Sequence, residues 1–163
     1  WGESQPVLVA AHDIDAGAAM GPSDVRLEER PRSSTPQGAL TELPDGQVLR
    51  SAVYEGEVLV GERLAPVGVH GLAATLPTGT RAVAIPVEPG LAPPLQVGDV
   101  VDVLVALAPE SAGSGPPGFV LAPSVLVVDV GEHAVAVAVE RDDAPRVAVA
   151  LGRGAVTLAL VGA

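Results

Sequence analysis

Apolar residues follow a two-residue period along much of the second half of the chain. In residues 81–87 (RAVAIPV) and 100–107 (VVDVLVAL), every second side chain is bulky and aliphatic, and Asp102 falls on the opposite face. Residues 134–139 (AVAVAV) and 155–161 (AVTLALV) repeat the alternation. One face of each segment is bulky and the other mostly small. Short strands at close spacing predict a compact sheet or barrel.

Breaker residues separate these predicted strands. Pro86 cannot donate a ladder hydrogen bond, which predicts an edge strand or a bulge. Gly98 and Asp99 predict a turn before the strand at 100–107. The stretch 108–118 (APESAGSGPPG) is rich in Gly, Pro and Ser, and predicts a mobile loop.

One segment of the second half has a helical pattern, residues 141–154 (RDDAPRVAVALGRG). Asp142 or Asp143 is expected as the N-cap, with Pro145 in the first turn and Gly152 as the stop. Val147 and Leu151 would point inward. The expected helix therefore spans about residues 142–152.

The first half contains an internal repeat centred on two glycines. Gly17 and Gly56 are 39 residues apart (56 − 17), and each lies in the pattern aliphatic-x-x-Gly-x-x-aliphatic-x-x-x-x-aliphatic. Such a pattern predicts a strand that turns at a glycine of positive φ, followed by an apolar anchor and a short helical segment. The matched aliphatic pairs are Ile14 with Val53, Met20 with Leu59, and Val25 with Leu64.

Composition supports a β-rich fold and narrows the classes of partner. Hydrophobic residues make up 48% of the 163 residues and aromatic residues only 2%, so the core must be built from Val, Leu, Ile and Ala. The formal net charge is −11, and all nine basic residues are Arg. No basic stripe is present to neutralise phosphates, which argues against nucleic acid as a partner and favours basic patches on protein partners.

No residue pattern indicates catalysis or a resident cofactor. Cysteine is absent, and His12, His70 and His133 lack ligand spacing, so no metal site is predicted. Glu28 and Glu29 would point to opposite sides of a strand, which does not suit an acid and base couple. The sequence therefore predicts a non-enzymatic protein without a cofactor.

The N-terminal segments VLVAAHDIDAGAAMGPSDVRLEERP and VYEGEVLVGERLAP resemble a SAF domain, the β-clip module shared by antifreeze-type domains, the flagellar P-ring chaperone FlgA and the pilus assembly protein CpaB. The segments GLAATLPTGTRAVAIPV, LQVGDVVDVLVAL and VLVVDV that follow are similar, in that order, to the RcpC/CpaB-type domain of Flp (tad) pilus assembly proteins. The resemblance covers about residues 7–161.

The resemblance implies a mainly β chain with two domains. A SAF β-clip domain is expected at residues 7–66 and a second, small β-rich RcpC/CpaB-like domain at 71–163, with the single helix inside it. It also implies a bacterial protein that acts through protein contacts with pilus or envelope assembly proteins, on the extracytoplasmic face of the cell membrane. Such proteins typically begin with a transmembrane anchor, which is expected upstream of Trp1.

Two other functions stay open at the level of sequence. A SAF module could bind a cell-wall or sialic-acid-like sugar, for which Arg26, Arg30 and Arg32 are the candidate binding residues. Sialic acid synthases carry an Arg-Pro-Gly segment after the first bend, whereas this chain keeps an Arg-Pro without the Gly-rich continuation. A FlgA-like periplasmic chaperone would instead carry a cleavable signal peptide.

Overall fold

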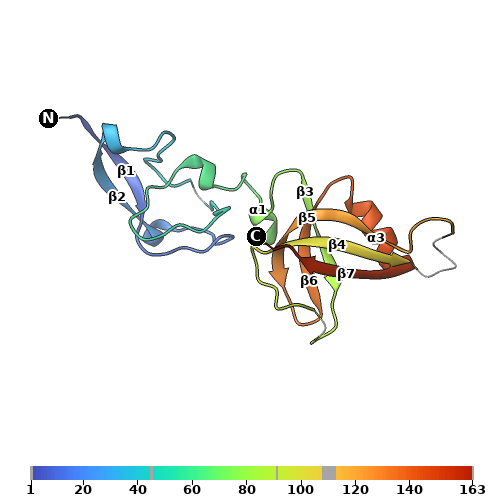
Figure 1. Ribbon diagram of the computed structural model, residues 1–163. Helices are drawn as coiled ribbons and strands as arrows, with labels where there is room; N and C mark the ends of the chain where they lie inside the picture. The colour runs from blue at the N-terminus through green and yellow to red at the C-terminus, as the bar shows by residue number, and fades with distance from the viewer. Residues whose placement is uncertain (1, 45, 91, 108–112, 163) are drawn as a thin grey trace. The chain divides into compact units, whose positions relative to one another are not determined.

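The computed structural model describes residues 2–44, 46–90, 92–107 and 113–162. The chain forms two compact units, Trp1–Thr75 and Leu76–Ala163 (Figure 1). Each unit has its own hydrophobic cluster. The predicted fold class is confirmed, because the chain is mainly β, with two sheets and one long helix close to the predicted position.

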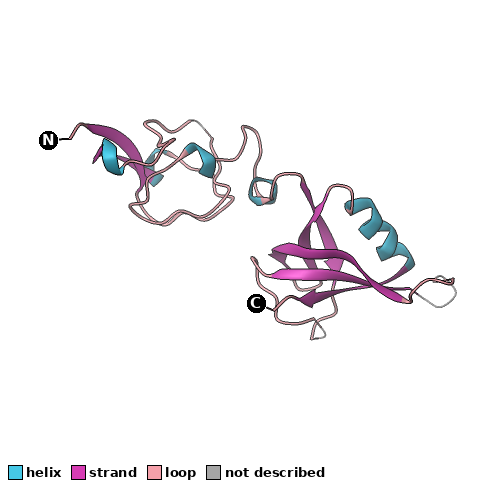
Figure 2. Ribbon diagram, turned by 45° about the horizontal axis from the view of Figure 1, so that its top comes forward, coloured by secondary structure: helices cyan, strands magenta, loops and turns pink. Residues whose placement is uncertain are grey.

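The first unit is built on one short hairpin-like pair of strands. Strand β1 (Ser4–Ala10) pairs antiparallel with β2 (Val25–Pro31) along their whole length. Beyond this pair, the described part of the unit consists mostly of loops joined by isolated bridges (Figure 2). Residues 7–10 of β1 are buried, so the apolar half of this strand carries one side of the core.

The internal repeat predicted from the sequence is present in three dimensions. Gly17 and Gly56 both have a positive φ, +82° and +79°. Short 3₁₀ helices follow each bend, η1 (Pro22–Asp24) and η3 (Gly61–Arg63), and these two helices are also offset by 39 residues. A third, η2 (Arg32–Ser34), follows β2. The buried aliphatic positions of both copies share one cluster: Ile14, Met20, Leu49, Val53 and Leu59.

The first unit ends with a short helix, α1 (Leu72–Thr75). Its buried residue Ala74 packs in a small cluster with Val48 and Ala65, which belong to the same unit. The division between the two units therefore falls after Thr75. No helix in the described ranges has the length and apolar character needed to cross a membrane.

The second unit is a five-stranded antiparallel sheet in the order β3-β6-β5-β4-β7. The strands are β3 (Thr80–Pro86), β4 (Val100–Leu107), β5 (Gly118–Val130), β6 (Ala134–Glu140) and β7 (Gly154–Leu160). Pro86 lies in an edge strand, as predicted. The bulky face of the alternating strands is buried, with Val101, Val103 and Val105 of β4 at its centre.

One long helix, α3 (Ala144–Arg153), covers part of the buried face (Figure 1). Val147 is fully buried in the core cluster and Leu151 packs against it, as expected. Asp143 is the N-cap residue, but its side chain caps no backbone N–H. The predicted stop at Gly152 is wrong, because the helix continues to Arg153 and Gly154 is the C-cap. Gly154 ends the helix because β7 begins there, against β4.

The predicted loop at 108–118 is described only in part. Residues 108–112 lie outside the described residues, so its mobility stays a prediction. From Gly113 the chain turns back, and the N–H of Leu107 donates to the carbonyl of Pro117 at 2.8 Å. Strand β5 then begins at Gly118.

Candidate functional site

The three arginines predicted as binding candidates lie on β2 and in the turn after it, beside carboxylates of the same unit. Arg26 Nε donates to Glu28 Oε1 at 2.8 Å, and Arg30 Nη2 donates to Glu28 Oε2 at 2.7 Å. Arg32 Nε lies 3.5 Å from Glu3 Oε2. The hydrogen bond from Arg26, helped by the charge of Arg30, holds the pKa of Glu28 below its ordinary value. These guanidinium groups are therefore largely neutralised by their own chain.

The histidines are not gathered into a metal centre in the part of the chain that is described, where no group of three or more potential ligands occurs. His12 Nε2 lies 2.9 Å from Asp24 Oδ1, and Nδ1 lies 2.8 Å from the carbonyl of Asp13. Both contacts favour the imidazolium and raise the pKa of His12, the Asp13 carbonyl most strongly. His133 is exposed in the other unit, 3.9 Å from Glu132.

The residues predicted as structural motifs shape turns. Gly98 has a φ of +99°, and Asp99 Oδ2 accepts a hydrogen bond from the N–H of Gln96 at 2.7 Å. This turn leads into β4. Gly17 and Gly56 form the two bends of the first unit. The role of all four residues is to direct the backbone.

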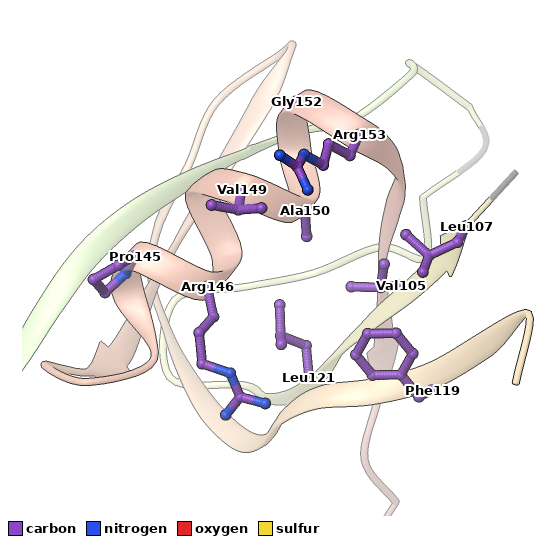
Figure 3. A pocket seen from close by; sticks show the side chains of 10 residues that line it. All are labelled: Val105, Leu107, Phe119, Leu121, Pro145, Arg146, Val149, Ala150, Gly152 and Arg153. Carbon is purple, nitrogen blue, oxygen red and sulfur yellow. The ribbon is translucent and has the colours of Figure 1, made fainter. Parts of the chain in front are cut away.

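A cleft of about 890 Å³ lies between α3 and the buried face of β4 and β5 (Figure 3). Strand side chains of Val105, Phe119 and Leu121 form one wall, and Val149 and Ala150 of α3 form the other. Leu121 is only 7% exposed, whereas Phe119 is 38% exposed and Val149 is 55% exposed. The helix therefore covers the strand face incompletely, and large apolar side chains face open space.

Two arginines of α3 border this apolar cleft, and both lie along its helix wall. Arg146 extends from the helix toward the strand that carries Leu121 and Phe119 (Figure 3). Its Nη1 atom donates to Asp143 Oδ1 at 3.0 Å. Arg153 has no ion-pair partner among the residues that the structure describes. In a chain of net charge −11, this cleft is a place where two guanidinium groups lie beside apolar side chains.

The strand beside the cleft has a free backbone edge. Strand β5 pairs with β4 from Gly118 onward, but its pairing with β6 begins only at Leu126. Residues 118–125 therefore have no strand on their other edge within the described ranges. Unpaired edge N–H and C=O groups are available to an added strand. The free edge and the apolar cleft adjoin each other at Phe119 and Leu121.

Sequence reasoning predicted the helix but missed the cleft. Arg146 and Arg153 are seven residues apart, which places them on one face of a helix, and this spacing was available as a signal. Phe119 is the chain's single phenylalanine, and an aromatic side chain contributes a large apolar surface wherever it lies. Nothing in the local pattern indicates that a helix and a strand so far apart in sequence leave a gap between them.

Together, the two units define a mainly β protein in which a duplicated, glycine-hinged unit precedes an open five-stranded sheet. Residues 5–65 match the SAF domain family, so the N-terminal unit carries a SAF domain, as predicted. The CpaB/RcpC type within that family stays a prediction. No curated protein and no solved structure gives a significant match to the chain. A SAF domain suggests an assembly-type or carbohydrate-binding module.

Proposed function

We propose that this chain is a non-enzymatic assembly module of the CpaB/RcpC type, which acts through protein contacts in building a Flp pilus at the extracytoplasmic face of a bacterial membrane. The main support for this proposal is the apolar cleft beside a free strand edge, because such a surface can bind another polypeptide as an added strand. The SAF domain at residues 5–65 and the β-rich unit that follows it in the chain support the CpaB/RcpC type.

The proposal is tested in the organism that carries the gene. Deletion of the gene is expected to remove surface pili counted by electron microscopy, and a plasmid copy is expected to restore them. Crosslinking of the tagged protein in intact cells, followed by mass spectrometry, is expected to recover pilus-apparatus components. A deletion strain that assembles normal pili would contradict the proposal, as would crosslinks that contain no such component.

One observation favours carbohydrate binding as a second candidate. The Nε atom of Arg30 is buried and has no hydrogen-bond partner in the described part of the chain. An anionic sugar would reach this donor, together with Arg26, after the Arg30 side chain turns away from Glu28. Calorimetry with N-acetylneuraminic acid, and a glycan array, test this candidate. Binding that is lost in Arg30→Gln would support it, and a flat response to every glycan would remove it.

A further inference from the structure

We propose that the cleft beside α3 binds an extended segment of a partner protein that carries both apolar and acidic side chains on the face turned toward the cleft. The segment adds as a strand to the free edge of β5, places its apolar side chains in the cleft, and pairs its carboxylates with Arg146 and Arg153. This inference rests on the proposed function, for which it names the contact surface and the chemistry of the partner.

The backbone of β5 provides the first half of the site. Its residues Gly118–Val120 and Ala122 pair with β4 on one side, with a register shift at Leu121, and their other side is open. In an antiparallel ladder, alternate residues direct their N–H and C=O groups toward opposite neighbours, so about half of these groups face the open side. Pro123 lacks an N–H donor, and Ser124 has a positive φ of 52°, so regular pairing would end there. An added ladder would therefore run over about residues 118–122.

The cleft provides the second half of the site. Phe119 and Leu121 both line the cleft, so both side chains are directed to the same side of the strand, on either side of the register shift with β4. A strand added in register follows the same alternation and sends every second side chain to that face. There those side chains would meet Phe119, Leu121 and the exposed Val149 of α3. A volume of about 890 Å³ holds several aliphatic side chains.

The two arginines select the charge of the bound segment. Seven residues along α3 separate Arg146 and Arg153 by about 10 Å. Side chains four residues apart in an extended peptide lie on the same face and about 13 Å from each other, so carboxylates at this spacing can reach both guanidinium groups from the cleft side. Asp143 neutralises only Arg146. The chain as a whole is strongly acidic, so the preference for an acidic peptide is a local property of this cleft.

The experiment uses the full chain and a displayed library of random ten-residue peptides. Selected peptides are expected to carry apolar and acidic side chains at every second position, so that both kinds share the face turned toward the cleft. Their synthetic copies are expected to bind in calorimetry, about tenfold more weakly to Arg153→Glu than to the wild-type chain. Arg81→Glu on β3 is the matched control, because it makes the same change of charge away from the cleft and is expected to leave affinity unchanged. Selection of no peptide, selection of basic peptides, or equal losses in both variants would overturn the proposal.

The strand-like geometry is tested separately with backbone-modified peptides. N-methylation of the selected peptide at alternate residues is expected to abolish binding in one register and to be tolerated in the other. Amide protons of β5 that face the open edge are expected to exchange more slowly in the complex. Tolerance of N-methylation at every position would overturn strand addition. Binding of laurate without binding of any peptide would likewise overturn the proposal, in favour of a small anionic amphiphile.

Failure of this inference differs from failure of the proposed function. An Arg153→Glu strain with normal pili, beside a deletion strain without pili, would leave the pilus role in place and refute the role of the cleft. A deletion strain with normal pili, together with retained peptide binding, would refute the pilus role and leave the cleft as a peptide site. The two experiments therefore give separate answers.

Discussion

Ile14 and Val53 donate their backbone N–H groups to each other's carbonyl oxygens, at 2.9 and 3.0 Å. They occupy the same position in the two copies of the repeat, offset by 39 residues. A position that pairs reciprocally with its own copy lies on a local twofold axis. The first unit is therefore a pseudosymmetric pair of bends that meet at this bridge.

The hydrogen bonds on either side of this bridge obey the same symmetry. The N–H of Gly17 donates to the carbonyl of Leu49 at 2.8 Å, and the N–H of Gly56 donates to the carbonyl of Ala10 at 2.9 Å. Each bond maps onto the other by the 39-residue offset. The two glycines are thus equivalent bends, and the N–H of each donates a hydrogen bond to the other copy of the repeat.

Replacing the second hinge should destabilise the first unit by conformation alone. A Cβ at Gly56 would meet nothing within 4 Å, but its φ of +79° lies in the left-handed region. Gly56→Ala is therefore expected to lower the free energy of unfolding by about 1–2 kcal/mol. Urea unfolding followed at the methyl signal of Ile14 measures this, because Ile14 belongs to the first unit and the other isoleucine, Ile85, to the second.

Gly61 in η3 is the matched control for this hinge. It lies outside the left-handed region, and a Cβ there also meets nothing within 4 Å. Gly61→Ala is expected to change the free energy of unfolding by less than about 0.5 kcal/mol. Equal losses in the two alanine variants would contradict the argument from φ.

The two copies of the repeat have different side-chain contacts at one pair of equivalent positions. This difference predicts that the stability of the first unit depends on pH. Arg63 Nη1 donates to Ser51 Oγ at 2.9 Å, whereas the first copy has His12 Nε2 at 2.9 Å from Asp24 Oδ1. The pKa of His12 is raised from 6.5, so its contribution to stability is complete below pH 6.5 and lost as the pH rises through the higher folded value. The pKa of Asp24 is lowered from 3.8, first by the Gly21 N–H and then by His12, so its contribution is complete above pH 3.8 and lost as the pH falls through the lower folded value.

The His12 and Asp24 contact should therefore stabilise most between about pH 3.8 and 6.5. NMR titration of the His12 ring is expected to give a pKa above 6.5. In Asp24→Asn this pKa is expected to fall but to stay above 6.5, because the bond to the Asp13 carbonyl, the larger cause, is retained. An unchanged His12 pKa in that variant would show that the contact is not formed in solution.

Two glycines at the end of α3 should respond to alanine in opposite ways. A Cβ at Gly154 would lie 2.6 Å from the carbonyl oxygen of Ala106, so Gly154→Ala is expected to cost about 1–3 kcal/mol by forcing β7 away from β4. Gly152 lies within the helix and has open space around it, so Gly152→Ala is expected to add about 0.5–1 kcal/mol. Urea unfolding followed at Ile85 measures both variants. A stabilising Gly154→Ala would contradict the close approach of the two strands.

The irregular stretch of β5 should be sensitive to side-chain branching. Ser124 has a φ of +52°, and its N–H donates to Asp102 Oδ1 at 2.7 Å. Ser124→Val is expected to cost about 1–2 kcal/mol, because β-branched residues avoid this region, whereas Ser124→Gly should cost nothing or stabilise. Asp102→Ala is expected to cost about 1 kcal/mol by removing the acceptor. The same Ile85 signal reports all three, and a valine variant as stable as the parent would refute the strain.

Local pattern predicted most of the elements of this protein, although not the short helix α1. Alternating valines predicted the strands of the second unit, Pro86 predicted an edge strand, and the 39-residue offset predicted two glycine bends, because backbone conformation and side-chain periodicity are short-range properties. The sequence also placed the long helix at about residues 142–152, within two residues of α3 at its start and one at its end.

Only the tertiary structure decided which residues meet. The stop of α3 depends on how closely β7 approaches the Ala106 carbonyl, and the neutralisation of Arg26 and Arg30 depends on their side chains converging on Glu28. The cleft exists because α3 covers the strand face incompletely where β6 no longer pairs with β5. These are distances between segments remote in sequence, which packing fixes and local periodicity does not contain.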